Sequence, residues 1–244
     1  MKGIVAQLTE GEQARLWTQR VSNLTALEKH YQAQGFFCLH TKENYEKARP
    51  LFEEAIAIEP NFVLPYVYLG YSHMMSVQRG WSESPAKSLQ MMFELAQKAL
   101  AIDDSHDGAH TLLAAYYNMK RQFDKGLAEV KKAVALNPNS SDAYMILAGT
   151  VGVMGRWEES VPYAKKSLRL SPFPGAYPFF ILGRAYFMTG QYDESITTLK
   201  KALKVSPNFI LAHLFLAACY SSLGRDAEAT AAAKQVLDRN PKFS

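Results

Sequence analysis

Two histidines, His106 and His110, stand four residues apart beside three aspartates, a spacing that could place two metal ligands on one helix face. The aspartates are Asp103, Asp104 and Asp107. The same residues also suit a turn that caps a helix, with His110 on the inward face of that helix. Two imidazoles without clearly placed further ligands make a poor metal site, so we expect no metal here.

The glycines Gly149, Gly152 and Gly155 recur every third residue and are the nearest approach to a phosphate-binding motif. They fall on a predicted helix, which favours close helix packing over phosphate binding. The sequence contains no P-loop, no dinucleotide-binding glycine motif, no HExxH, no GxSxG and no EF-hand loop. We therefore expect no catalytic residue and no cofactor, and a chain that is not an enzyme.

Composition points to a protein of the cytoplasm. The chain has 244 residues, and 48% hydrophobic content suffices for a large core. Cys38 and Cys219 are far apart and outside any CxxC pattern, which suits a reducing compartment. The N-terminus lacks a signal peptide, and turn residues and a histidine break up the uncharged run 205–224, so we expect no membrane span.

An internal repeat organises the chain. Pro138, Pro172, Pro207 and Pro241 recur at a nearly constant interval of about 34 residues, within the range typical of repeat architectures. Each ends a helix-like phrase such as VALNP or LKVSP. The boundaries predict units at about 23–60, 61–104, 105–138, 139–172, 173–207 and 208–241. The second unit carries ten extra residues around SVQRGWSESPAKS, which we expect to lengthen both of its helices, the second running from 85 to 102.

Small residues stand at the same place in four units, where two helices must approach closely. They are Ala114, Ala148, Gly183 and Ala217. With phrases such as AYPFFILGRAYFMTGQYDESITTLKKALKVSP, each unit resembles a tetratricopeptide repeat, a helix-turn-helix of about 34 residues. The resemblance implies an all-α fold, a right-handed α-solenoid of about six repeats, in which residues 1–22 form a short N-terminal capping helix and linker.

In that family the first helices line a concave groove, which implies a surface for a protein or peptide partner. Helical spacing places eight candidate partner-binding residues there: Tyr71, Met74, Asn118, Met145, Tyr177, Phe180, Arg184 and Phe187. Asn118 and Arg184 could hold the partner's backbone or a carboxylate. Packing between repeats is the alternative role for each aromatic or methionine. The carboxylate clamp of chaperone-binding family members is missing, because its places carry residues such as Tyr71 and Gly149.

Two further surfaces invite interpretation. Lysine pairs at 131–132, 165–166 and 200–201 predict a basic ridge on the second helices. The simplest interpretation of this ridge is a solvated helix face. Few aromatic residues lie among these lysines, which argues against nucleic acid as a partner. Trp81 lies at the tip of the lengthened second unit. We expect it to pack against a neighbouring unit, with an accessory contact to a partner as the alternative.

A narrower resemblance covers the chain nearly end to end. The phrases TEGEQARLW, GWSESPAKSLQMMFELAQKALAIDDSHDGAHTLLAAYY and NPKFS are similar to the C-terminal repeat region of bacterial class III adenylate or guanylate cyclase-like proteins. That likeness implies a non-catalytic regulatory region downstream of a cyclase domain, with that domain or a second copy of the chain as partner. A free-standing adaptor that binds a peptide or helix in its groove is the alternative.

Overall fold

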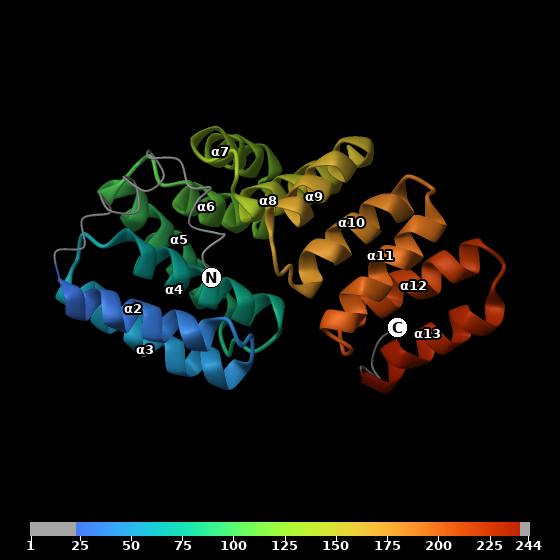
Figure 1. Ribbon diagram of the computed structural model, residues 1–244, viewed down its shortest axis with the longest axis horizontal. Coiled ribbons are helices and arrows are strands. Elements are labelled where there is room, and N and C mark those ends of the chain that lie inside the picture. The colour runs from blue at the N-terminus through green and yellow to red at the C-terminus, as the bar shows by residue number, and fades with distance from the viewer. Residues whose placement is uncertain (1–22, 240–244) are drawn as a thin grey trace, which may run out of the picture. The chain divides into compact units, whose positions relative to one another are not determined.

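The computed structural model describes residues 23–239. Over this range the chain folds into twelve α-helices without a strand, which confirms the all-α repeat fold expected from the period (Figure 1). The helices divide between two compact units, residues 1–116 (unit 1) and 117–244 (unit 2), and the division falls within α6. The capping helix expected within residues 1–22 lies outside the described residues.

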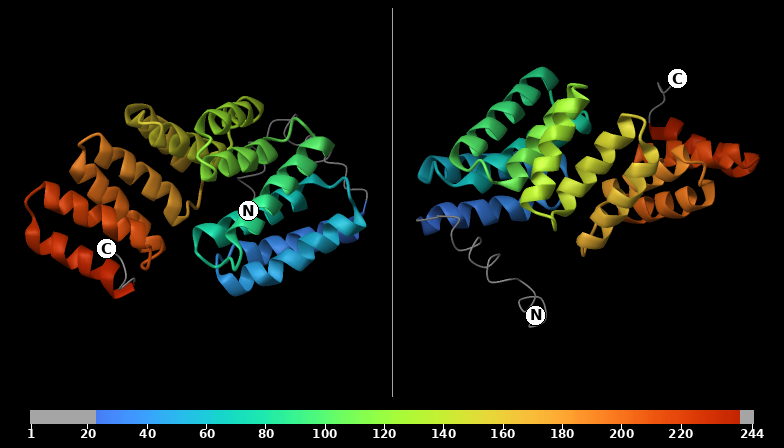
Figure 2. Two further views of the ribbon diagram at one scale, coloured as in Figure 1. Left: turned by 180° about the vertical axis from the view of Figure 1, so that it is seen from behind. Right: turned by 90° about the horizontal axis from the view of Figure 1, so that it is seen from above.

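The helices follow one another as six consecutive pairs. Unit 1 and the start of unit 2 contain α2 (Leu24–Phe37), α3 (Lys42–Ile58), α4 (Val63–Gln78), α5 (Pro85–Ile102) and α6 (Asp107–Met119). Unit 2 continues with α7 (Phe123–Leu136), α8 (Ser141–Val153), α9 (Trp157–Leu170), α10 (Ala176–Met188), α11 (Tyr192–Val205), α12 (Ile210–Ser222) and α13 (Asp226–Arg239). Within each unit, helices adjacent in sequence pack side by side, as two further views show (Figure 2).

Backbone geometry at the turns explains why the pairs recur. Gly155, Gly190 and Gly224 follow the first helices of the last three pairs with φ of +84°, +76° and +69°, a left-handed conformation that glycine adopts without steric cost. Arg121 occupies the equivalent position in the third pair with φ of +58°. A side chain in that conformation is strained, so the third turn forms against its own local preference.

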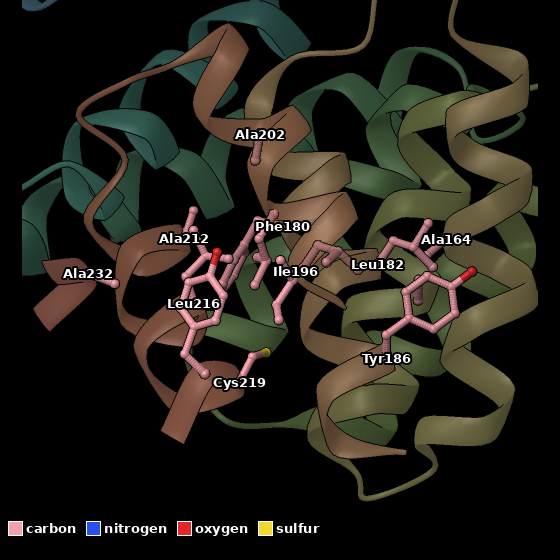
Figure 3. Close-up of a cluster of buried hydrophobic side chains, with 14 residues drawn as sticks. Ala164, Phe180, Leu182, Tyr186, Ile196, Ala202, Ala212, Leu216, Cys219 and Ala232 are labelled. Carbon is pink, nitrogen blue, oxygen red and sulfur yellow. The ribbon is translucent and has the colours of Figure 1, made fainter. Parts of the chain in front are cut away.

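Each unit has its own hydrophobic core. In unit 1, Phe52 of α3 and Val67 and Leu69 of α4 are buried together with small residues such as Ala48. In unit 2, Phe180 and Leu182 of α10 meet Ile196 of α11 and Leu216 of α12 (Figure 3). Of the small residues predicted from the period, Ala114 and Ala148 are fully buried and Gly183 is also buried, whereas Ala217 is half-buried.

The second pair is longer than the others, as its extra residues predicted. Its helices have 16 and 18 residues, and α5 spans 85–102 as expected. Trp81, in the connecting segment, is half-buried, and its ring centroid lies 5.9 Å from that of Tyr45 on α3. The Arg79 guanidinium carbon lies 5.4 Å from the Trp81 ring centroid. The tip of the long pair therefore packs back onto the first pair.

Candidate functional site

The structure divides the eight groove candidates between the two units. Tyr71 and Met74 lie on α4 of unit 1, and the other six lie in unit 2, four of them on α10. Those four are Tyr177, Phe180, Arg184 and Phe187. At 100° per residue, positions three, seven and ten after Tyr177 return to one side of a helix, so the four side chains share a face of α10.

The aromatic members of the α10 face join a larger aromatic cluster. The ring of Phe180 lies 5.8 Å from that of Tyr177 and 5.6 Å from that of Phe215 on α12. Phe187 approaches Phe215 to 5.5 Å, with the rings at 88°. These are the distances and tilts at which aromatic pairs attract. Phe180 is only 3% exposed, and it therefore acts by packing between α10 and α12.

Four apolar side chains on the first helices of unit 2 remain open to solvent at two repeated places. Tyr177 on α10 and Leu211 on α12 stand one repeat apart and are 36% and 40% exposed. Val153 on α8 and Met188 on α10 also stand one repeat apart and are 42% and 47% exposed. Tyr177, Arg184 and Met188 lie on one side of α10, because positions seven and eleven after Tyr177 return to within about 20° of it at about 100° per residue. Leu211 and Val153 occupy the equivalent places on α12 and α8, which α10 contacts. We call these five residues the first-helix face.

Arg184 occupies the middle of the first-helix face. Its guanidinium carbon lies 5.1 Å from the ring centroid of Trp157 on α9 and 5.6 Å from that of Phe180, within the range of cation–π attraction. Its Nε is buried without a hydrogen-bond acceptor. Desolvation lowers the pKa of Arg184, and nearby Tyr177 opposes that decrease. Burial also raises the pKa of Tyr177, and the charge of nearby Arg184 opposes that increase.

The position of Trp157 next to Arg184 requires a glycine at position 152 of α8. A Cβ at this glycine would lie 2.7 Å from Cζ3 of Trp157, so the indole ring occupies space that only glycine leaves. In this space the Trp157 ring centroid lies 5.1 Å from the guanidinium carbon of Arg184. The sequence pattern showed Gly152 as part of a glycine run and did not connect it with either residue.

The remaining candidates have local roles in the structure. The Asn118 side-chain amide donates to Thr150 Oγ1 at 2.7 Å, and its Oδ1 is buried without a hydrogen bond. Met145 packs against the unit 2 core. Met74 is 7% exposed and contributes to packing in unit 1, while Tyr71 is half-buried.

His106 and His110 make hydrogen bonds with the backbone. Ring nitrogen Nε2 of His110 lies 2.9 Å from the carbonyl oxygen of Asp104, and Nδ1 of His106 accepts from the amide of Ala109 at 3.3 Å. Both rings are largely buried at the start of α6. Across residues 23–239, no three His, Cys, Asp or Glu side chains gather closely enough to hold a metal ion.

Sequence reasoning missed Val153, Met188, Leu211 and Trp157 as parts of the first-helix face. The period contained the signal for Leu211, because it falls one repeat after Tyr177, which was selected. Trp157 lies at the start of a second helix, and second helices were assigned to the outer surface. Its participation follows from three-dimensional packing alone.

Sequence models of known families match parts of the chain. The model described as TPR repeat matches residues 183–224, and the one described as tetratricopeptide repeat matches residues 31–62 and 211–243. No curated protein has a significant sequence match to this chain.

Solved structures share the fold. TTC0263, a thermophilic TPR protein of Thermus thermophilus, has a TM-score of 0.61 at 18% identity over 80% of this chain and 98% of its own. YrrB, described as a TPR protein with an unusual peptide-binding site, has a TM-score of 0.52 at 17% identity over 79% and 93%. The Cut9–Hcn1 assembly of APC/C has a TM-score of 0.73 at 16% identity over 89% of this chain but 40% of that one. Tetratricopeptide-repeat models thus match two parts of the chain, and the solved structures share its fold. Between residues 23 and 239, no helix has the length and apolar character needed to cross a membrane.

Proposed function

We propose that this tetratricopeptide-repeat chain is a non-catalytic protein-interaction module, and that the first-helix face of unit 2 holds a peptide or helix of a protein partner. The observation that carries the proposal is the repeated exposure of apolar side chains at Tyr177, Leu211, Val153 and Met188. Exposed apolar side chains that recur on one face favour burial against a partner. YrrB, a structural neighbour, is described as having a peptide-binding site.

Selection of peptides on the full chain tests this proposal. A random dodecapeptide library displayed on phage should yield sequences that bind the wild-type chain and lose about ten-fold or more in affinity for a Tyr177→Ser, Met188→Ser double variant. Truncating exposed interface anchors costs about 1–2 kcal/mol each. The matched control is Tyr31→Ser on α2, because Tyr31 is 58% exposed but lies in unit 1. Equal loss in both variants, or no enriched peptide, would contradict the proposal.

A narrower form of the proposal makes the chain the regulatory C-terminal part of a bacterial, cytoplasmic cyclase-like protein. Its support is the order of sequence phrases such as TEGEQARLW and NPKFS, and the catalytic residues would belong to a domain upstream. The partner would then be that domain or a second copy of the chain. The gene upstream of the Met1 codon decides the matter: an open reading frame without a nucleotidyl cyclase domain would leave a free-standing adaptor.

A further inference from the structure

Resting on the proposed function, we propose that Arg184 binds the side-chain carboxylate of an aspartate or glutamate located within the partner peptide. The first-helix face would thus be specific for a peptide in which apolar residues flank an acidic one.

Arg184 carries a charge that no side chain of residues 23–239 neutralises. Within the described residues no carboxylate forms an ion pair with it, whereas Arg156 and Arg225 of the same unit pair with Glu159 and Glu228. Its Nε already lacks an acceptor. A half-buried guanidinium beside aromatic rings has lost part of its hydration without gaining an anion. A bound carboxylate would compensate for that loss.

The aromatic rings beside Arg184 offer no oxygen acceptor to its N–H groups. The ring centroids of Trp157 and Phe180 both lie at cation–π distance from the guanidinium carbon of Arg184. A guanidinium binds carboxylates through the N–H groups at its edge, in a bidentate pair. Attraction to an aromatic ring uses none of these N–H donors as hydrogen-bond donors to oxygen, so the rings do not compete with a carboxylate for them.

The exposed residues around Arg184 indicate the source of the carboxylate. Exposed apolar residues lie on either side of α10, with Val153 on α8 and Leu211 on α12. A peptide that covers both continues past Arg184 in both directions, so it presents a side chain there and not its terminus. Unit 2 also favours an acidic peptide, since residues 117–239 contain sixteen basic and ten acidic side chains, a net charge of +6.

A double-mutant cycle on selected peptides tests the inference. Peptides enriched on the wild-type chain are synthesised with amidated C-termini and a fluorescein label, and each acidic residue is replaced in turn by its amide. We expect one Asp→Asn or Glu→Gln replacement to weaken binding about ten- to hundred-fold for the wild type, the range of a charged hydrogen bond. The same replacement should have less than a three-fold effect for Arg184→Gln.

Two further variants sharpen the test. Arg184→Lys keeps the charge but removes the planar fork, and should recover only part of the affinity. Arg225→Gln is the matched control. The guanidinium carbon of Arg225 lies 4.7 Å from the ring centroid of Tyr220, but Arg225 already pairs with Glu228. The Arg225→Gln variant should therefore bind the selected peptides with the affinity of the wild type. Should Arg184→Gln fail to fold, Arg184→Lys replaces it in the cycle. The acidic and amide peptides are then compared on the wild-type chain and on the Arg184→Lys chain.

The outcomes separate the inference from the proposal on which it rests. Enriched peptides without an acidic residue, or acidic replacements that weaken binding equally with and without Arg184, overturn the carboxylate assignment and leave the interaction module intact. Peptides that bind only with a free C-terminal carboxylate also overturn it. Failure to enrich any peptide contradicts both.

Discussion

Two half-buried arginines, one in each unit, have opposite surroundings. In unit 1, Arg49 of α3 donates from Nε to Ser72 Oγ at 3.1 Å and from Nη2 to the Ser72 carbonyl oxygen at 3.1 Å, and it also reaches Ser76 Oγ. In unit 2, Arg184 faces aromatic rings and its Nε has no acceptor. Arg49 thus uses both Nε and Nη2 as donors within the fold, whereas among residues 23–239 the buried Nε of Arg184 has no acceptor. This contrast is the reason why we propose recognition by unit 2.

For other buried polar groups the contrast between the units is reversed. In unit 2, Ser160 and Ser195 replace the alanine usual in the second helix, and each donates its hydroxyl to a carbonyl of the preceding helix, on Ala148 at 2.8 Å and on Gly183 at 2.7 Å. In unit 1, both ring nitrogens of His30 and of His73 are buried without a hydrogen bond. Unit 1 therefore carries polar groups that burial destabilises, and unit 2 pairs most of its own.

The largest difference that we expect between the units is in their response to acid: the free energy of unfolding of unit 1 should fall at low pH. His30 is surrounded by the rings of Tyr31, Phe52, Phe62 and Tyr68, and burial lowers its pKa to about 4. The pKa of His73 is likewise lowered to about 4, by burial and by Arg49. Because the unfolded chain takes up a proton near pH 6.5 and the folded chain only near 4, stability is full above pH 6.5 and falls as the pH drops toward 4. Each histidine should remove about 2 kcal/mol of stability between about pH 7.5 and about pH 5.

Hydrogen exchange followed by mass spectrometry at the two pH values, corrected for intrinsic exchange rates, measures this loss separately for α2–α4 and α10–α12. A His30→Met, His73→Met variant should flatten the pH dependence of α2–α4. If α10–α12 lose protection as steeply as α2–α4, or if the variant keeps the wild-type slope, the contrast between the units is wrong.

A smaller effect tests whether the first helices α8 and α10 approach their neighbours equally closely. A Cβ at Gly183 of α10 would lie 2.7 Å from Cγ and Cδ2 of the fully buried Leu199, whereas one at Gly149 of α8 would meet Ile181 Cδ1 at an ordinary 3.7 Å. Gly183→Ala should therefore destabilise the chain by about 1–3 kcal/mol through overpacking. Gly149→Ala should be neutral or stabilise it by up to about 1 kcal/mol, because alanine favours the helix. Urea unfolding monitored by circular dichroism compares the two, and equal effects would contradict the difference in packing.

The fold was accessible from sequence because its determinants recur. Four prolines at a fixed period, a small residue such as Gly183 where helices cross, and glycines such as Gly190 after first helices all report local backbone and packing requirements. The eight groove candidates followed from the same period, but their accessibility did not. Phe180 and Met74 are buried, and Arg184 depends on Trp157 from another pair, so burial and long-range stacking decided which candidates are available.

The smallest expected effect concerns the tip of the long second pair, where unit 1 has its own aromatic surface. Trp81 is half-buried against Tyr45, and Arg79 lies over its ring. Because part of the indole is already covered, Trp81→Ala should lower the free energy of unfolding by about 1–2 kcal/mol, the range of a partly buried aromatic contact. It should leave the affinity of peptides selected on the chain within two-fold of wild type, since we place their site in unit 2. Thermal melting and fluorescence anisotropy on the same variant measure the two effects. A large loss of affinity with unchanged stability would instead make Trp81 a partner contact, and recognition would no longer belong to unit 2 alone.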